Sequence, residues 1–238
     1  MNTNLVIDCG NTLIKYGVFT DNQLIENGLI NDSINTILER HPSILKAIIA
    51  SVTQEHLVIL PKLQHLKQSH LFTNTLNLPI ENLYETTQTL GSDRLAASIG
   101  AFTLHPNSNV LTIDAGTCIK YNFVNEQNQF IGGAISPGLS MRLKALHQFT
   151  NALPLIDFDE NYENLTGKNT KDSILSGALI GAVCEVESMI QQYQNTYSIL
   201  KIVFTGGNAN YLCKQLKNRF FADEHLILKG LNAVLNFQ

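Results

Sequence analysis

The sequence predicts an α/β protein whose two halves repeat one order of secondary-structure elements. Segments that read as strands alternate with segments that read as helices, a pattern typical of this class. The order strand, Asp-x-Gly turn, strand, turn, strand, helix occurs twice, with the two turns beginning at Asp8 and Asp114. A breaker, His-Pro-Asn-Ser-Asn, separates the halves at residues 105–109. We therefore expect an internal duplication, with an N-terminal lobe over residues 1–105 and a C-terminal lobe over 106–238.

The first half opens with an apolar strand that leads into a turn of small and polar residues. Asp32 or Ser33 can cap a short helix that ends near Arg40, and a longer helix is expected over residues 95–104. Strands are expected over residues 4–8, 13–19, 23–30, 47–52 and 71–73.

The second half starts the same pattern again. Helices are expected over residues 138–149 and 175–193, and another is expected after residue 208. Strands are expected over residues 110–114, 119–124, 129–135, 201–204 and 226–228.

Charge and composition exclude several classes of partner. The formal net charge is −4 and no run of Lys or Arg stands out, which argues against a nucleic-acid or anionic-membrane surface. The N-terminus lacks the basic region of a signal peptide, and the apolar residues 174–183 are too few to span a bilayer. We expect a cytoplasmic protein with free thiols, because its four cysteines form no CxxC pair: Cys9, Cys118, Cys184 and Cys213.

The first Asp-x-Gly turn, at residues 8–12, suits a phosphate. Gly10 lets the backbone approach closely, and the backbone N–H groups with Asn11 and Thr12 can donate to phosphate oxygens. Asp8 cannot donate when ionised, and its oxygens suit Mg²⁺, directly or through water. Taken alone, the segment also fits an ordinary hairpin turn.

The second turn, at residues 114–117, lies at the same place in the other half. Two such loops at strand ends indicate a clamp of N–H donors and carboxylates around a polyphosphate and its metal. Neither a complete Walker A sequence nor a GxGxxG motif is present. Adjacent glycines at 206 and 207 follow a late strand and could accept an adenosine on bare backbone, or form a simple strand-to-helix turn.

A third motif, Gly91-Ser92-Asp93-Arg94, begins the helix expected near residue 95. A helix N-terminus favours anions, and the planar guanidinium of Arg94 matches a carboxylate. Asp93 beside it could accept a proton from an attacking hydroxyl. The alternative is a solvated helix cap.

Together these motifs resemble the type III pantothenate kinases, members of the acetate and sugar kinase, Hsp70 and actin superfamily. The resemblance covers nearly the whole chain and rests on six motifs in order: Asp8-x-Gly10-Asn11-Thr12, Gly91-x-Asp93-Arg94, Asp114-x-Gly116-Thr117, Gly132-Gly133-x-Ile135-x-Pro137-Gly138, Gly167-x-Asn169-Thr170 and Thr205-Gly206-Gly207.

The resemblance implies two duplicated ribonuclease-H-like lobes with an ATP cleft between them. It implies transfer of the ATP γ-phosphate to the primary hydroxyl of pantothenate, which gives 4′-phosphopantothenate in the first step of coenzyme A biosynthesis. It also implies a homodimer and a monovalent cation, K⁺ or NH₄⁺, besides Mg²⁺.

The family's residue roles fall on matching positions of this chain. The general base falls on Asp93 and the monovalent-cation ligand on Asp114, and the oxygens of Asp8 make it the magnesium candidate. Substrate contacts fall on Tyr84, Gly91, Ser92, Asp93, Arg94 and Thr170. ATP contacts fall on Asp8, Cys9, Gly10, Asn11, Thr12, Leu13, Ile14, Lys15 and Thr117.

One departure concerns the loop after Tyr84. Family members often carry Pro three residues after this tyrosine, where this chain has Thr87. Two alternatives stay open on the sequence: another small-alcohol kinase or phosphatase of the same superfamily, and a non-catalytic ATP-binding regulator. A regulator would not need Asp93, and a sugar kinase would usually be longer and leave the Gly-x-Asp-Arg motif unexplained.

Overall fold

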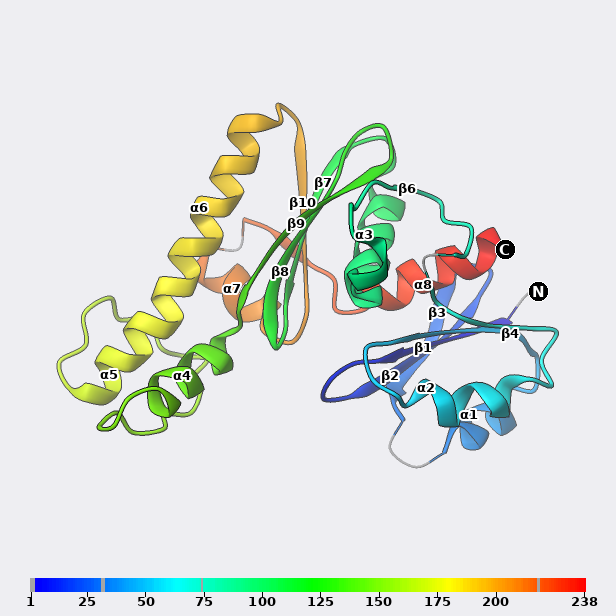
Figure 1. Cartoon of the computed structure of the whole chain (residues 1–238), viewed down its shortest axis with the longest axis horizontal. Helices are drawn as coiled ribbons and strands as arrows, with labels where there is room; N and C mark the ends of the chain where they lie inside the picture. Colours follow the sequence, from blue (N-terminus) through cyan, green and yellow to red (C-terminus); the bar gives the residue numbers. More distant parts are fainter. Residues whose placement is uncertain (1–2, 31–32, 74, 218) are drawn as a thin grey trace. The chain divides into compact units, whose positions relative to one another are not determined.

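The computed structural model describes residues 3–30, 33–73, 75–217 and 219–238 (Figure 1). The chain divides into two compact units. The first unit comprises Met1–Ser108, Val124–Gly132 and His225–Gln238, and the second comprises Asn109–Phe123 and Gly133–Glu224. The end of the chain thus belongs to the first unit, whereas the boundary predicted at residue 105 assigned it to the C-terminal lobe.

The first unit contains a five-stranded sheet in the order β3-β2-β1-β4-β5. Its central strand β1 is buried along its whole length, pairs antiparallel with β2 and pairs parallel with β4. The strands are β1 (Thr3–Cys9), β2 (Ile14–Thr20), β3 (Gln23–Leu29), β4 (Ile44–Ser51) and β5 (Gln68–Leu71).

Helices α3 (Ser92–Leu104) and α8 (Leu226–Phe237) pack tightly within the first unit. Gly100 lies against the backbone of Leu226 and Gly230 against that of Ala96, with no room for a Cβ at either glycine. Residues 226–228 therefore begin a helix, and the strand expected there is wrong. Their apolar run continues at helical spacing into a buried helix face that includes Leu231, Val234 and Leu235. This packing returns the C-terminal segment to the first unit.

Shorter helices complete the first unit. α1 (Ile34–Arg40) is capped by Ser33, whose side chain accepts the N–H of Asn35 at 3.2 Å, and Asp32 lies outside the described residues. The others are α2 (His56–Ile59) and the 3₁₀ turns η1 (Leu60–Leu63) and η2 (Thr87–Thr89).

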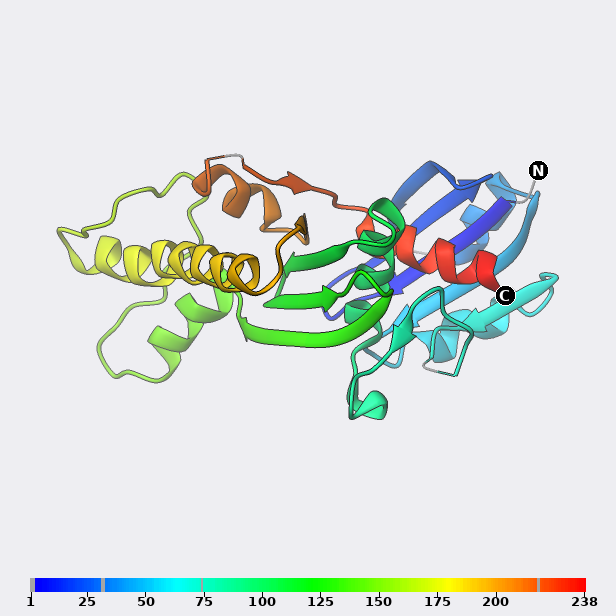
Figure 2. The ribbon, with the colours of Figure 1, turned by 90° about the horizontal axis from the view of Figure 1, so that it is seen from above.

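The second sheet has six strands in the order β11-β10-β7-β8-β9-β6. β7 is buried throughout and pairs parallel with β10, which in turn pairs parallel with β11. Figure 2 shows β7, β8 and β9 as neighbouring green arrows. The strands are β6 (Glu81–Asn82), β7 (Asn109–Ala115), β8 (Cys118–Val124), β9 (Gln129–Pro137), β10 (Leu200–Thr205) and β11 (Phe221–Ala222), of which β6 and its partners Gln129 and Phe130 count with the first unit.

The second unit also contains one long helical run, Thr170–Thr196. It consists of α5 (Thr170–Leu175), a π-helical turn η3 (Ser176–Ile180) and α6 (Gly181–Thr196). The run is long and apolar enough to cross a membrane, a test that the core helix of a soluble protein also passes. Ala182, Val186 and Ile190 repeat every four residues and are buried in the core of this unit. The remaining helices are α4 (Leu139–Gln148) and α7 (Ala209–Gln215).

Candidate active site

The first Asp-x-Gly turn is the tip of the β1–β2 hairpin. The N–H of Gly10 donates to the C=O of Leu13 at 3.1 Å, which closes the turn, and Asn11, Thr12 and Leu13 are exposed. Ile14 and Lys15 already belong to β2. The tip thus presents polar groups to a ligand, but an ordinary hairpin has the same geometry, so phosphate binding stays a prediction.

Asp8 and Cys9, by contrast, are buried at the end of β1. Cys9 has no exposed surface, and burial together with the neighbouring Asp8 raises the pKa of its thiol to about 11. Only the backbone of Cys9 can therefore reach a ligand. Among the described residues, no group of three or more His, Cys, Asp or Glu side chains could hold a metal. Mg²⁺ bound mainly by phosphates and water needs only one or two carboxylates, so Asp8 stays a candidate.

The Gly91-Ser92-Asp93-Arg94 motif forms the start of α3. Gly91 is the N-cap residue, and the hydroxyl of Ser92 donates to the C=O of Ser51 on β4 at 3.3 Å. Oδ1 of Asp93 accepts the N–H of Arg94 at 2.9 Å. These contacts place the Asp93 carboxylate at the N-terminal end of α3.

The structure brings Tyr84 and Arg94 together. Arg94 is only 5% exposed, its NH1 donates to the Tyr84 hydroxyl at 3.4 Å, and its Cζ lies 5.3 Å from the centre of the Tyr84 ring. The ring also packs against Phe130, with centroids 6.0 Å apart, and against Gly132, whose φ is +129°. Tyr84 is thus held on several sides, although Thr87 replaces the family's usual proline.

A pocket of about 420 Å³ opens beside the start of α3. Its walls come from the ends of β4 and β5 and from the loop before α3, all within the first unit. The lining residues are Ser51, Val52, His56, Leu71, Phe72, Thr73, Gln88, Leu90, Gly91 and Ser92. Two of the predicted substrate residues therefore line a pocket of a size that suits a small molecule.

The second Asp-x-Gly turn connects β7 and β8 in the second unit. The N–H of Gly138 donates to the C=O of Thr117 at 3.1 Å, and that of Asn208 donates to the C=O of Ala115 at 2.9 Å. The turn at residues 114–117 therefore contacts two segments that are distant in sequence: Gly138, just after β9, and Asn208, just after β10. Thr117 makes the contact with Gly138, and Ala115 makes the contact with Asn208.

Asp114 of this turn has a partner that the sequence reasoning missed. Nζ of Lys120, on β8, lies 2.6 Å from Oδ2 of Asp114, and the side chains are 17% and 5% exposed, respectively. The available signal was a lysine inside the predicted strand 119–124, where four of the six residues are apolar or aromatic. Such a residue needs a partner for its charge.

A network centred on Glu185 of α6 was also missed. Its carboxylate accepts hydrogen bonds from Tyr121 at 3.0 Å, from Ser136 at 2.6 Å and from Arg142. Partial burial raises the pKa of Glu185, but the three hydrogen-bond donors lower it by more. The pKa of Glu185 therefore lies below its ordinary value. Arg142 also donates to the C=O of Pro137 at 2.9 Å, which connects the network to the residue before Gly138.

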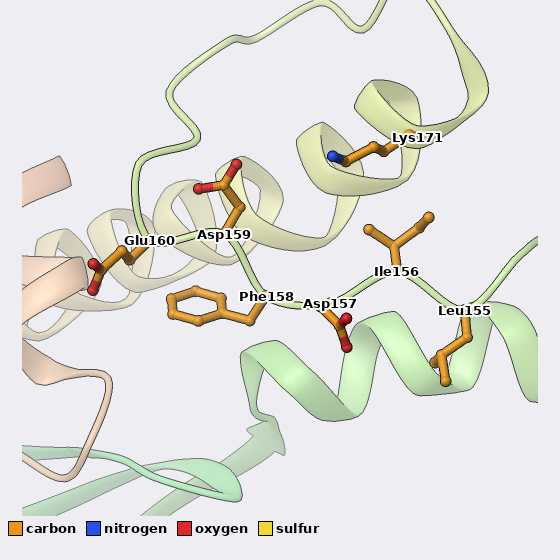
Figure 3. Close-up of a pocket in the computed structure, with 7 residues that line it drawn as sticks. All are labelled: Leu155, Ile156, Asp157, Phe158, Asp159, Glu160 and Lys171. Carbon is orange, nitrogen blue, oxygen red and sulfur yellow. The ribbon is translucent and has the colours of Figure 1, made fainter.

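Thr170, the remaining predicted substrate residue, is exposed at the first position of α5, where Asn169 is the N-cap. The next residue, Lys171, lines a pocket of about 740 Å³ in the second unit. Figure 3 shows Lys171 extending from the helix and the acidic side chains on the facing segment 155–160. The sequence reasoning did not find this pocket.

Comparisons with known proteins address the identity of the chain. The family model described as type III pantothenate kinase matches residues 4–192. A type III pantothenate kinase of Christiangramia forsetii is 40% identical over 239 residues, covering 98% of each chain.

Solved structures share the fold at lower identity. A Campylobacter jejuni protein described as a Baf family transcriptional activator superposes with a TM-score of 0.66, at 20% identity and 98% coverage of both chains. A glucokinase from an Antarctic psychrotroph gives a TM-score of 0.57, at 13% identity and 100% coverage of both. These likenesses confirm the fold alone, whereas the family match and the 40% identity decide membership: the chain belongs to the type III pantothenate kinase family.

Proposed function

We propose that this protein is a pantothenate kinase, which transfers the γ-phosphate of ATP to the primary hydroxyl of pantothenate and forms 4′-phosphopantothenate. The observation that carries this proposal is the match to type III pantothenate kinases over almost the full length of both chains. The product would enter coenzyme A biosynthesis. An ATP-dependent kinase also agrees with the fold, which the chain shares with a glucokinase.

The acceptor would be bound by residues at the start of α3. We assign Arg94 to the carboxylate of pantothenate, because its planar fork is already oriented by Tyr84. Asp93 would orient the hydroxyl and accept its proton, and the bond from the Arg94 N–H fixes the position of its carboxylate. An ordinary carboxylate is a weak base near neutral pH. Orientation therefore matters more than basicity in a loose phosphoryl-transfer transition state. Tyr84, Gly91, Ser92 and Thr170 complete the proposed acceptor set.

The nucleotide would be bound by the hairpin tip at residues 8–15 and by Thr117. The exposed tip offers the N–H groups and side chains of Asn11 and Thr12 to phosphate oxygens. Asp8 would hold Mg²⁺ directly or through water, and the ion would offset negative charge on the phosphates. The backbone around Gly206 and Gly207 is our proposal for the adenosine.

The family resemblance also implies a monovalent cation at Asp114, and the donors present there fit such an ion poorly. A potassium ion needs several oxygens to replace its hydration shell. Oδ2 of Asp114 is instead held by the Lys120 ammonium at 2.6 Å. No step of the proposed mechanism therefore passes through a bound monovalent cation.

Assembly and location are further parts of the proposal. We propose a homodimer, and its support is a set of apolar side chains exposed on the second unit: Ile135, Phe149, Leu155, Leu165 and Ile199. Light scattering coupled to gel filtration would test it, and a monomeric mass would contradict it. We also propose a cytoplasmic enzyme that binds neither nucleic acid nor membrane, and the net charge of −4 supports the second part of this proposal.

One experiment separates this function from the two alternatives. Release of ADP from ATP is measured by chromatography with and without pantothenate. Pantothenate-dependent ADP supports the kinase. ADP formed equally without an acceptor supports a hydrolase, and ADP formed only with a sugar supports a sugar kinase. ATP binding without ADP formation supports a non-catalytic regulator.

A further inference from the structure

Lys120 holds the position at which the family resemblance puts a monovalent cation. We propose that its ammonium group supplies this positive charge from within the chain, so that the enzyme turns over without added K⁺ or NH₄⁺. The inference rests on the proposed kinase function and concerns how the same site is neutralised.

The Asp114 carboxylate is enclosed on both of its oxygens. Oδ2 accepts from Nζ of Lys120 at 2.6 Å. Oδ1 faces the backbone of Gly206 so closely that a Cβ at that glycine would lie 2.5 Å from it. The side chain of Asp114 is only 5% exposed, so water screens this pair little. The carboxylate is therefore paired with a cation in an environment where that pairing is strong.

The lysine is held at both ends of its side chain. Its backbone belongs to β8, between the buried residues Ile119 and Tyr121, and its ammonium is fixed on Asp114. Tethering gives the charge a high effective concentration at the carboxylate, which a free ion would have to match from solution. A second cation on Asp114 would also be repelled by the lysine.

The chemistry of the Lys120 ammonium group supports its role in place of the ion. A lysine ammonium carries one positive charge and three N–H donors, as a strongly hydrated point charge. It is thus a close chemical relative of NH₄⁺, one of the two ions that the family resemblance implies. Pairing it with Asp114 makes the site electrically neutral, as a bound monovalent cation would.

The test compares salts at constant ionic strength. The full chain is exchanged into choline chloride, and ADP is measured by chromatography, so that no coupling enzyme adds a cation requirement. We expect kcat/KM for ATP, with pantothenate present, to agree within about twofold between choline chloride, KCl and NH₄Cl. A fall of tenfold or more in choline chloride, reversed by KCl or NH₄Cl, would overturn the inference.

Lys120→Met removes the charge and keeps most of the side-chain volume. We expect its turnover to fall at least tenfold in choline chloride and to recover in part with NH₄Cl or KCl. Lys201→Met is the matched control, because Lys201 is an exposed lysine on β10, another strand of the same sheet, and it should behave as the wild type. Unchanged turnover of Lys120→Met in choline chloride would contradict the proposal.

Thermal unfolding gives a second readout that does not depend on activity. Tm of the wild type should be the same in KCl and choline chloride, whereas Tm of Lys120→Met should rise with K⁺ or NH₄⁺. If this variant is inactive in every salt, absence of that rise overturns the proposal. The kinase function and the inference about Lys120 are refuted by different results. Wild type that forms no pantothenate-dependent ADP in any salt refutes the kinase function, whereas ADP formed only with K⁺ or NH₄⁺ refutes the inference alone.

Discussion

The backbone of Gly206 lies directly against the carboxylate of Asp114. The two residues come from parallel strands, since Thr205 of β10 pairs with Asp114 of β7. Gly206 has a φ of +90°, and a Cβ there would lie 2.5 Å from Oδ1 of Asp114 and 2.7 Å from the carbonyl of Ala115. The glycine therefore sets how closely the late Gly-Gly motif can approach the second Asp-x-Gly turn.

Replacement of Gly206 by alanine should destabilise the second unit. A positive φ and a clash with backbone atoms together cost about 2–4 kcal/mol, which lowers Tm by at least about 5 °C. Gly207→Ala is the control, because its φ is not positive and no atom lies within 4 Å of a Cβ at that position. Thermal unfolding by circular dichroism measures both, and equal Tm values would contradict the close approach.

Asp93→Asn should separate binding from turnover. The amide oxygen can still accept the N–H of Arg94, so the start of α3 and the affinity for ATP should be kept. Loss of the base should lower kcat by about 10²–10⁴-fold. Steady-state kinetics and ATP titration by calorimetry measure the two effects. Near-normal turnover would remove Asp93 as the base.

Arg94→Lys should raise the KM for pantothenate. Lysine keeps the charge but loses the planar fork and its stacking on Tyr84, so we expect a rise of about tenfold or more. Tyr84→Phe is the matched comparison, because it removes the 3.4 Å bond to Arg94 and keeps the ring, and its effect should be smaller. An unchanged KM in Arg94→Lys would move the carboxylate contact elsewhere.

The Glu185 network predicts a pH-dependent stability. Because the pKa of Glu185 is lowered in the folded state, its contribution is complete above the ordinary glutamate pKa of about 4.3 and is lost as pH falls through the folded-state value. Glu185→Gln should therefore cost about 1–2 kcal/mol at pH 7, and the difference from wild type should shrink below about pH 4. Urea unfolding of the variant and the wild type, at pH 7 and below about pH 4, measures this difference in the free energy of unfolding.

Glu187→Gln provides the control on the same helix. Glu187 pairs with Arg219, and both side chains are 56% exposed, so the change should alter stability by less than about 0.5 kcal/mol at either pH. A cost for Glu187→Gln as large as that for Glu185→Gln would show that the network has no special role.

The sequence predicted those parts of the fold whose signals are local. β1 and β7 were recognisable because each is an apolar run that ends in an Asp-x-Gly turn, and burial along their full length confirms them. The start of α8 was not recognisable, because the three consecutive apolar residues 226–228 fit either a strand or a buried helix. Its helical state follows from packing against α3, which no local pattern encodes.

The candidate site divides in the same way. The motifs around Asp8, Asp93 and Asp114 could be recognised because each consists of four or five consecutive residues. Glu185 and its donors are separated by as many as 64 residues in sequence, so only the fold brings them together. Lys120 is six residues from Asp114, yet its role depends on the direction of a side chain on β8, which the sequence reasoning did not address.

The central claim is that pantothenate accepts the γ-phosphate of ATP. Its most direct test incubates the enzyme with pantothenate and ATP labelled in the γ-phosphate, and identifies the labelled product by chromatography and mass spectrometry. The account predicts label on the primary hydroxyl of pantothenate, with Asp93→Asn forming at least about a hundredfold less of this product per unit time. Label found only in inorganic phosphate, or no transfer while ATP remains bound, would contradict it.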